Sequence, residues 1–191
     1  YEISACLVGS EMCIRDRHRS KGLEFPVVFV ADTDHKFNQS DAIRPVLTHS
    51  RLGVGVMLRA PRAAKRFKTL PYAALAQAIR TETLSEEMRV LYVALTRAQD
   101  ALIITVPLKK TASALKTPAL CAAAEATGSE SMRSMGSWAG WILTAAMLHP
   151  DSDALWGYTS FLPHHRPTEV PLTIRLVLSL IHISEPTRQA E

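Results

Sequence analysis

Cysteine is scarce in this sequence. Its 191 residues include three cysteines, and two of them, Cys6 and Cys13, lie close to the N-terminus. The third, Cys121, lies in an alanine-rich stretch. This usage excludes a disulfide framework in the body of the chain. We therefore predict that Cys121 is an ordinary small residue in a helix. The pair His164–His165 has no further ligands at metal spacing, so we predict that it lies on the surface.

Long apolar runs are also missing. The stretch Leu176–Ile183 is too short to span a bilayer, and no signal peptide is recognisable. We expect a cytoplasmic protein by default. The sequence has no G-x-x-x-x-G-K-[S/T] segment either, which is the loop that cradles nucleotide phosphates. It shows no carboxylate–lysine cluster of a nuclease, and we predict that His149 and 151–153 form a loop.

The two ends of the chain are related to each other at the level of codons. One choice of codons for Cys6–Asp16, read as its reverse complement, encodes Leu178–Arg188, and extending it through 3–5 completes 189–191. The DNA so obtained resembles a transposase-based sequencing adapter. We therefore expect residues 1–17 and 178–191 to be adapter-derived and non-native. Sequencing the locus from independent DNA tests this expectation.

The formal net charge is +4. The two terminal segments hold three arginines and five carboxylates, so the remainder is more basic than the whole chain. A basic excess suits a phosphate-bearing partner, although it is common among proteins of many functions.

Two apolar segments predict β-strands. Val27–Ala31 is rich in β-branched valine and bounded by proline and aspartate, and a second run covers 101–106. Between them, Tyr72–Arg80 is predicted to be helical. Thr83 followed by Glu86 is typical of a capping box, so we expect a new helix to begin there. Strands that alternate with helices predict an α/β fold.

The segment between the first strand and these helices contains a predicted hairpin and a basic run. Val46–Thr48 and Gly53–Met57 are expected to pair. We favour a solvated loop or helix face for the basic run, and the alternative is a contact with a DNA backbone that weakens in salt. The run consists of Arg59, Arg62, Lys65, Arg66 and Lys68.

Helices are also predicted after Pro107. Residues 111–126 should form a helix that is broken at Pro118, and Ser137–Leu148 should form another. Within the second helix, three large apolar residues are expected in a core or an interface: Trp138, Trp141 and Ile142.

Two short segments have residues that suit phosphate and sugar chemistry. In the first, His18–Pro26, Gly22 allows a close backbone approach and Glu24 can accept hydrogen bonds from ribose hydroxyls. His18 and Ser20 can contact DNA phosphate or sugar. In the second, Glu86–Ala98, the planar fork of Arg97 suits phosphate oxygens. The alternatives are a surface turn at 20–22 and an arginine that interacts with a helix dipole.

Together and in this order, the two segments resemble the last two ATP-and-DNA-coupling motifs of superfamily 1 helicases of the UvrD type. The resemblance runs from His18 to Val106 and continues through the second predicted strand. It is greatest with the second motor domain of the AddA type of ATP-dependent helicase/nuclease. Ser137–Leu143 with His149–Pro150 is similar to the helical segment that follows the motor in that type.

The resemblance implies a role for each candidate residue. Arg97 matches the catalytic arginine that contacts the γ-phosphate, Glu24 matches the residue that holds the ribose, and Gly22 lies beside it. His18 and Ser20 fall in the part of the motif that faces single-stranded DNA. The implied activity is ATP-driven DNA translocation and unwinding in double-strand-break repair and recombination. The resemblance also implies ATP with Mg²⁺, a partner that is the B subunit of the helicase/nuclease, and a bacterial cytoplasm.

The predicted organisation follows from these observations. Residues 18–108 are expected to be the C-terminal part of a second RecA-like domain, in an incomplete fold of the P-loop NTPase type. A helical segment is expected over 109–150, and a linker or truncated unit over 151–177. Without the phosphate-binding loop the isolated chain is expected to be inactive, and its truncated parallel sheet should leave apolar faces uncovered. The alternative is a non-catalytic RecA-like module that binds DNA or a partner.

Overall fold

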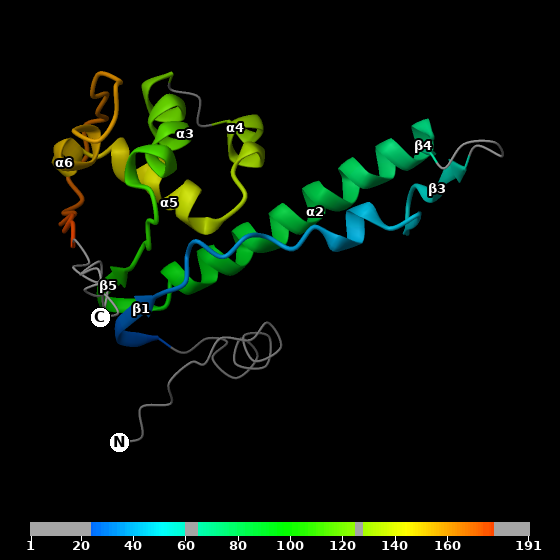
Figure 1. Ribbon diagram of the computed structural model, residues 1–191. Helices are drawn as coiled ribbons and strands as arrows, with labels where there is room; N and C mark the ends of the chain where they lie inside the picture. Colours follow the sequence, from blue (N-terminus) through cyan, green and yellow to red (C-terminus); the bar gives the residue numbers. More distant parts are fainter. Residues whose placement is uncertain (1–23, 60–64, 125–127, 178–191) are drawn as a thin grey trace, which may run out of the picture. The chain divides into compact units, whose positions relative to one another are not determined.

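The computed structural model describes residues 24–59, 65–124 and 128–177. Its chain divides into two compact units (Figure 1). One unit extends to Pro107 and includes Gly136–Trp138, and the other holds Leu108–Met135 and the chain from Ala139 onward. The two segments predicted to be adapter-derived lie outside the described residues. So do three candidate site residues, His18, Ser20 and Gly22.

The two predicted strands are confirmed and pair with each other in parallel. Strand β1, Phe25–Val30, lies beside strand β5, Ala98–Ile104, with Val28 opposite Leu102. This two-stranded sheet leaves much of its apolar surface uncovered, as predicted for a truncated parallel sheet. Phe29, for example, is 68% exposed. Together with the helices, the strands confirm a mixed α/β chain.

One long helix, α2, Leu70–Leu95, lies just before β5 in the sequence. It begins at Thr69, whose hydroxyl accepts a hydrogen bond from the backbone N–H of Tyr72 at 3.3 Å. The predicted start at Thr83 is wrong. The Thr83 hydroxyl donates to the carbonyl of Ile79, four residues earlier, at 3.0 Å. No glycine or proline interrupts the sequence from 72 to 95, so the helix continues through this capping pattern.

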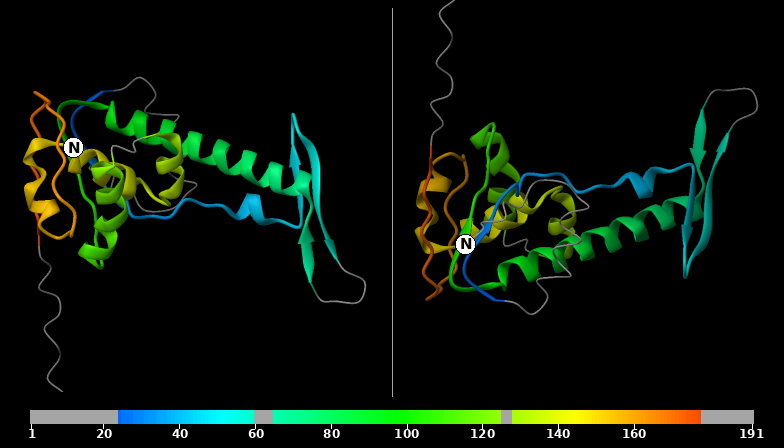
Figure 2. Two further views of the ribbon diagram at one scale, coloured as in Figure 1. Left: turned by 90° about the horizontal axis from the view of Figure 1, so that it is seen from above. Right: turned by 90° about the horizontal axis from the view of Figure 1, so that it is seen from below.

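A three-stranded antiparallel sheet packs at the N-terminal end of α2 (Figure 2). After the 3-10 helix η1, Ser40–Ile43, the strands are β2, Val46–His49, β3, Gly53–Arg59, and β4, Arg66–Lys68, in the order β2–β3–β4. The predicted hairpin is confirmed by the pairing of β2 with β3. Arg62 of the basic run lies outside the described residues. The other four residues are exposed, as predicted, but those at 59, 66 and 68 lie on strands instead of a loop or helix.

A small core joins this sheet to the helix. Leu47 of β2 packs with Tyr72, Leu75 and Ala76 of α2, all of them buried. Gly55 permits the close approach, because a Cβ atom there would lie 2.7 Å from the Cα atom of Tyr72. The sheet and the helix are thus packed backbone to backbone at this point.

His49, at the end of β2, bonds to both the β2–β3 turn and helix α2. Its ring Nδ1 accepts hydrogen bonds from the backbone N–H groups of Arg51 and Leu52. Its Nε2 lies 2.9 Å from Oε1 of Glu82 on α2. The ring therefore connects the β2–β3 turn to the helix.

The second unit consists of helices and extended chain. Helix α3, Thr111–Ala123, is followed by α4, Ser129–Ser134, and α5, Trp138–Met147, and then by η2, Pro150–Ser152, and α6, Asp153–Trp156. The helix predicted near Ser137 is confirmed. The predicted break at Pro118 is wrong, because α3 continues through this buried proline. Cys121 is buried in the same helix, as expected.

The core of this unit contains two tryptophans. Trp141 is buried, as predicted, and its indole N–H donates to the carbonyl of Met132 at 2.9 Å. Trp156 donates to the carbonyl of Met147. The ring of His165 stands edge-on to Trp156 and contacts Asp153, and its side chain remains 29% exposed, so this histidine lies partly at the surface. Residues 151–153 form η2 and the start of α6, where a loop was predicted. Of the helices described, none is long and apolar enough to cross a membrane.

Candidate functional site

Glu24 and Arg97, from the two segments singled out in the sequence, lie at the same end of the parallel strand pair, each just before the first residue of its strand. The backbone N–H of Phe25 donates to the carbonyl of Arg97 at 2.8 Å, and Phe25 lies opposite Ala98 in the register. Residues that are far apart in the sequence thereby lie on neighbouring strand starts.

The Arg97 side chain is held at the end of helix α2. Thr96 caps the helix, and the Arg97 side-chain Nε donates to the carbonyl of Val93 at 3.2 Å. A helix C-terminus attracts a cation, so this is the contact that the helix-dipole interpretation predicts. It is also compatible with a phosphate ligand, because a guanidinium carries five N–H donors in all. The side chain is partly exposed.

Glu24 has a polar neighbour that the sequence patterns did not reveal. The side-chain Nε2 of Gln99 on β5 donates to Oε2 of Glu24 at 3.0 Å. A carboxylate has about four lone-pair positions, so this bond leaves capacity for a further donor such as a sugar hydroxyl. The signal for Gln99 is its polarity within an apolar strand, but only the strand register places it beside Glu24.

The site lies at the amino ends of β1 and β5. In open α/β sheets, ligands usually bind beyond the carboxyl ends of the strands. This general rule therefore does not predict a site at the amino ends. At the carboxyl end of β1, Asp32 adopts a left-handed backbone conformation with φ of 56°. The next residue, Thr33, is buried and donates its hydroxyl to the carbonyl of Thr105 at 2.9 Å. At that end, hydrogen bonds join the segment after β1 to Thr105, just after β5.

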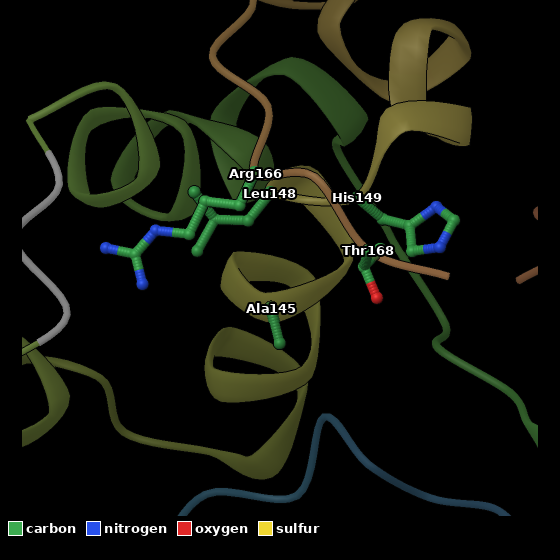
Figure 3. A pocket seen from close by; sticks show the side chains of 5 residues that line it. All are labelled: Ala145, Leu148, His149, Arg166 and Thr168. Carbon is green, nitrogen blue, oxygen red and sulfur yellow. The ribbon is translucent and has the colours of Figure 1, made fainter. Parts of the chain in front are cut away.

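The second unit contains a shallow pocket of about 210 Å³. It is lined by Ala145, Leu148, His149, Arg166 and Thr168. In Figure 3 the side chains of His149 and Arg166 point in opposite directions. Both ring nitrogens of His149 contact backbone groups, the N–H of residue 151 at 3.1 Å and the carbonyl of residue 170 at 2.8 Å. We therefore assign His149 a structural role. No group of three metal-ligating side chains occurs within the residues that the structure describes.

The family comparison agrees with this interpretation of the motifs. The model of the UvrD-like helicase C-terminal domain family matches residues 10–109, a range that includes Glu24, Arg97 and both strands. The chain belongs to the UvrD-like helicase C-terminal domain family.

Individual relatives carry a narrower description. The chain is similar to several bacterial proteins that are each named as the A subunit of an ATP-dependent helicase/nuclease. It is 51% identical to the protein of Ruminiclostridium cellulolyticum over 46% of the chain, and 39% identical to that of Moorella thermoacetica over 72%. For Lactiplantibacillus plantarum the identity is 32% over 84%. The matches cover 7%, 10% and 13% of these relatives, respectively, so the chain spans only a small part of their length.

Proposed function

We propose that this chain is the nucleotide-sensing part of an ATP-dependent DNA motor, in a second domain of the RecA type. The observation that supports this proposal most directly is that Glu24 and Arg97 immediately precede the paired first residues of the two parallel strands. A module that only binds a partner has no need for a carboxylate and an arginine just before two paired strands.

In this proposal the two side chains bind different parts of ATP. Glu24 accepts a hydrogen bond from a ribose hydroxyl while Gln99 orients the carboxylate from the other strand. Arg97 donates to oxygens of the γ-phosphate, and its attachment to the carbonyl of Val93 keeps the side chain near the C-terminus of α2. A phosphate oxygen is a stronger acceptor for a guanidinium than the Val93 carbonyl is, because phosphate and guanidinium are both charged.

The chemical contribution of Arg97 is electrostatic. Phosphoryl transfer spreads negative charge over the transferred group, and a positioned arginine stabilises that charge in the transition state. Because Arg97 directly follows a long helix and directly precedes a strand, a movement of the γ-phosphate would be transmitted to both elements. We propose that this coupling drives translocation and unwinding in double-strand-break repair and recombination.

The remaining parts of the motor would come from outside this chain. The sequence has no phosphate-binding loop, and its described residues offer no cluster for Mg²⁺. We therefore derive no step through the metal. The 191-residue chain alone should show no ATPase activity, since half of the nucleotide cleft is missing. We further propose that DNA is the track, that the B subunit of the helicase/nuclease is the partner, and that the bacterial cytoplasm is the location.

The test is Arg97→Ala in the parent protein that contains this chain. We expect DNA-stimulated ATP hydrolysis to fall by about three to five powers of ten. Nucleotide affinity, measured with a fluorescent ATP analogue, should change only a few-fold, because the arginine acts mainly on the transition state. Arg80→Ala is the matched control, since Arg80 is exposed on α2, the helix that ends shortly before Arg97, and lies outside both motifs.

Normal turnover by Arg97→Ala would refute the proposed role of this arginine. A parent protein that binds DNA but hydrolyses no ATP even as the wild type would favour the binding module instead. Arg97→Lys sharpens the test: it keeps the charge and removes the planar fork, so only partial recovery is expected.

A further inference from the structure

The β3–β4 ribbon carries an unusual charge arrangement. Arg59 and Arg66 lie directly opposite each other in the antiparallel register, and Lys68 lies opposite Met57 on the same pair of strands. Like charges at directly opposed positions destabilise a sheet. In the described part of the chain, no carboxylate forms an ion pair with either arginine.

The alternation of side chains along the strands separates two faces. Gly55 faces the buried core with α2, so Met57 and Arg59 share that face and their partners Lys68 and Arg66 do as well. The opposite face is apolar and exposed, with Val54, Val56, Leu58 and Phe67. The cations therefore gather on one face of the ribbon, beyond the core, and do not alternate around it.

The neighbouring helix end adds to this positive potential. Strand β4 leads directly to the N-cap Thr69, so Arg66 and Lys68 lie just before the N-terminus of α2. The first turn of α2 contains no acidic residue. A helix N-terminus is equivalent to roughly half a positive charge. Many proteins place Asp or Glu at such an end, and here cationic side chains precede it.

We propose that this basic face, formed by Arg59, Arg66 and Lys68, binds the phosphate backbone of double-stranded nucleic acid. All three side chains are exposed. Residues two apart on a strand are about 6.8 Å from each other, and a duplex presents one negative charge per about 1.7 Å of its axis. That charge density can neutralise the opposed arginines, and a two-stranded ribbon is narrow enough to lie along a duplex groove.

This surface is separate from Glu24 and Arg97, and binding to it needs no ATP. The inference therefore goes beyond the proposed function, and each can fail alone. No base-reading arrangement is visible among these cations, so the binding should be independent of sequence and sensitive to salt.

The experiment measures binding of the full 191-residue chain to a short fluorescein-labelled duplex by fluorescence anisotropy, at salt concentrations from about 50 to 200 mM. The variant Arg59→Glu/Arg66→Glu keeps a like-charge pair at the same register and reverses its sign. We expect affinity to fall about tenfold or more, and the slope of log K against log salt to decrease in magnitude by about two. The control Lys109→Glu/Lys116→Glu changes the net charge equally at exposed positions in the second unit.

Equal binding by the wild type and the Arg59→Glu/Arg66→Glu variant would overturn the proposal, as would equal losses in the variant and the lysine control. Binding to the single strand but not to the duplex would also overturn it. Displacement of the duplex by poly-L-glutamate as readily as by unlabelled duplex would point to an acidic protein and reject nucleic acid. Should the double glutamate variant fail to fold by far-UV circular dichroism, Arg59→Gln/Arg66→Gln removes the charges without reversing them, and the same loss of slope is expected.

Discussion

The two β-sheets of the first unit differ in how completely they bury their apolar residues. The antiparallel sheet β2–β3–β4 has one face closed by α2, with Leu47 only 2% exposed. The parallel pair β1–β5 leaves Phe25, Val27 and Phe29 exposed on one strand and Leu102 and Ile103 on the other. Strands β1 and β3 are both mostly apolar, so composition alone does not explain the difference.

The difference follows from topology. Antiparallel strands are joined by short turns and can complete a small core with the helix that follows them. Parallel strands are normally covered on both faces by crossover helices and need neighbours on both edges. Among the described residues no third strand pairs with β1 or β5, so both edges of this sheet lack a neighbouring strand there.

The largest predicted effect contrasts the two sheets directly. Leu47→Ala should lower the free energy of unfolding by about 2–5 kcal/mol, because it leaves a cavity in the core beside Tyr72. Phe29→Ala should change the same quantity by less than about 0.5 kcal/mol, because Phe29 is largely exposed. Urea unfolding followed by far-UV circular dichroism measures both.

Hydrogen exchange of the α2 amides should report the Leu47→Ala loss locally, and Phe29→Ala should leave that exchange unchanged. An equal cost for the two substitutions would mean that the face of β1 is covered in solution, and the contrast between the sheets would then be wrong.

A smaller effect tests the close packing of β3 on α2. Gly55→Ala would place a Cβ atom 2.7 Å from the Cα and 2.9 Å from the backbone N of Tyr72. Backbone atoms cannot rotate away, so the strand or the helix must shift, at a cost of about 1–3 kcal/mol. The same urea titration measures it.

The control for this substitution is Gly136→Ala, where a Cβ atom meets nothing within 4 Å and the backbone is not left-handed. It should be neutral or slightly stabilising. A neutral Gly55→Ala would show that the sheet and the helix are not in close contact.

The sequence patterns predicted elements whose signals are local. Both strands of the parallel pair and the β2–β3 hairpin were found from runs of apolar residues and turn glycines. The patterns failed where two local signals compete. Thr83 with Glu86 fits a helix start, but its hydroxyl bonds back into the previous turn, and nothing between 72 and 95 stops the helix.

Features that depend on pairing were not predictable in the same way. The segment Arg66-Phe67-Lys68 has only one apolar residue, and it becomes a strand because β3 offers it an edge. At the candidate site, Arg97 and Glu24 could be proposed from residue chemistry and motif resemblance. Gln99 could not, because its contact with Glu24 depends on a register that no local pattern specifies.

The smallest predicted effect has the opposite sign. The hydroxyl of Tyr72 is buried and has no hydrogen-bond partner among the described residues. An unsatisfied buried hydroxyl is costly, so Tyr72→Phe should raise the free energy of unfolding by up to about 1 kcal/mol while the ring keeps its packing against Leu47. Tyr158→Phe is the control, since Tyr158 is 42% exposed and its hydroxyl can bond to water. The same unfolding titration compares the two. A loss of stability in Tyr72→Phe alone would show that the hydroxyl bonds to a partner in solution. The core between the antiparallel sheet and α2 would then hold a polar contact that the contrast with the β1–β5 sheet leaves out.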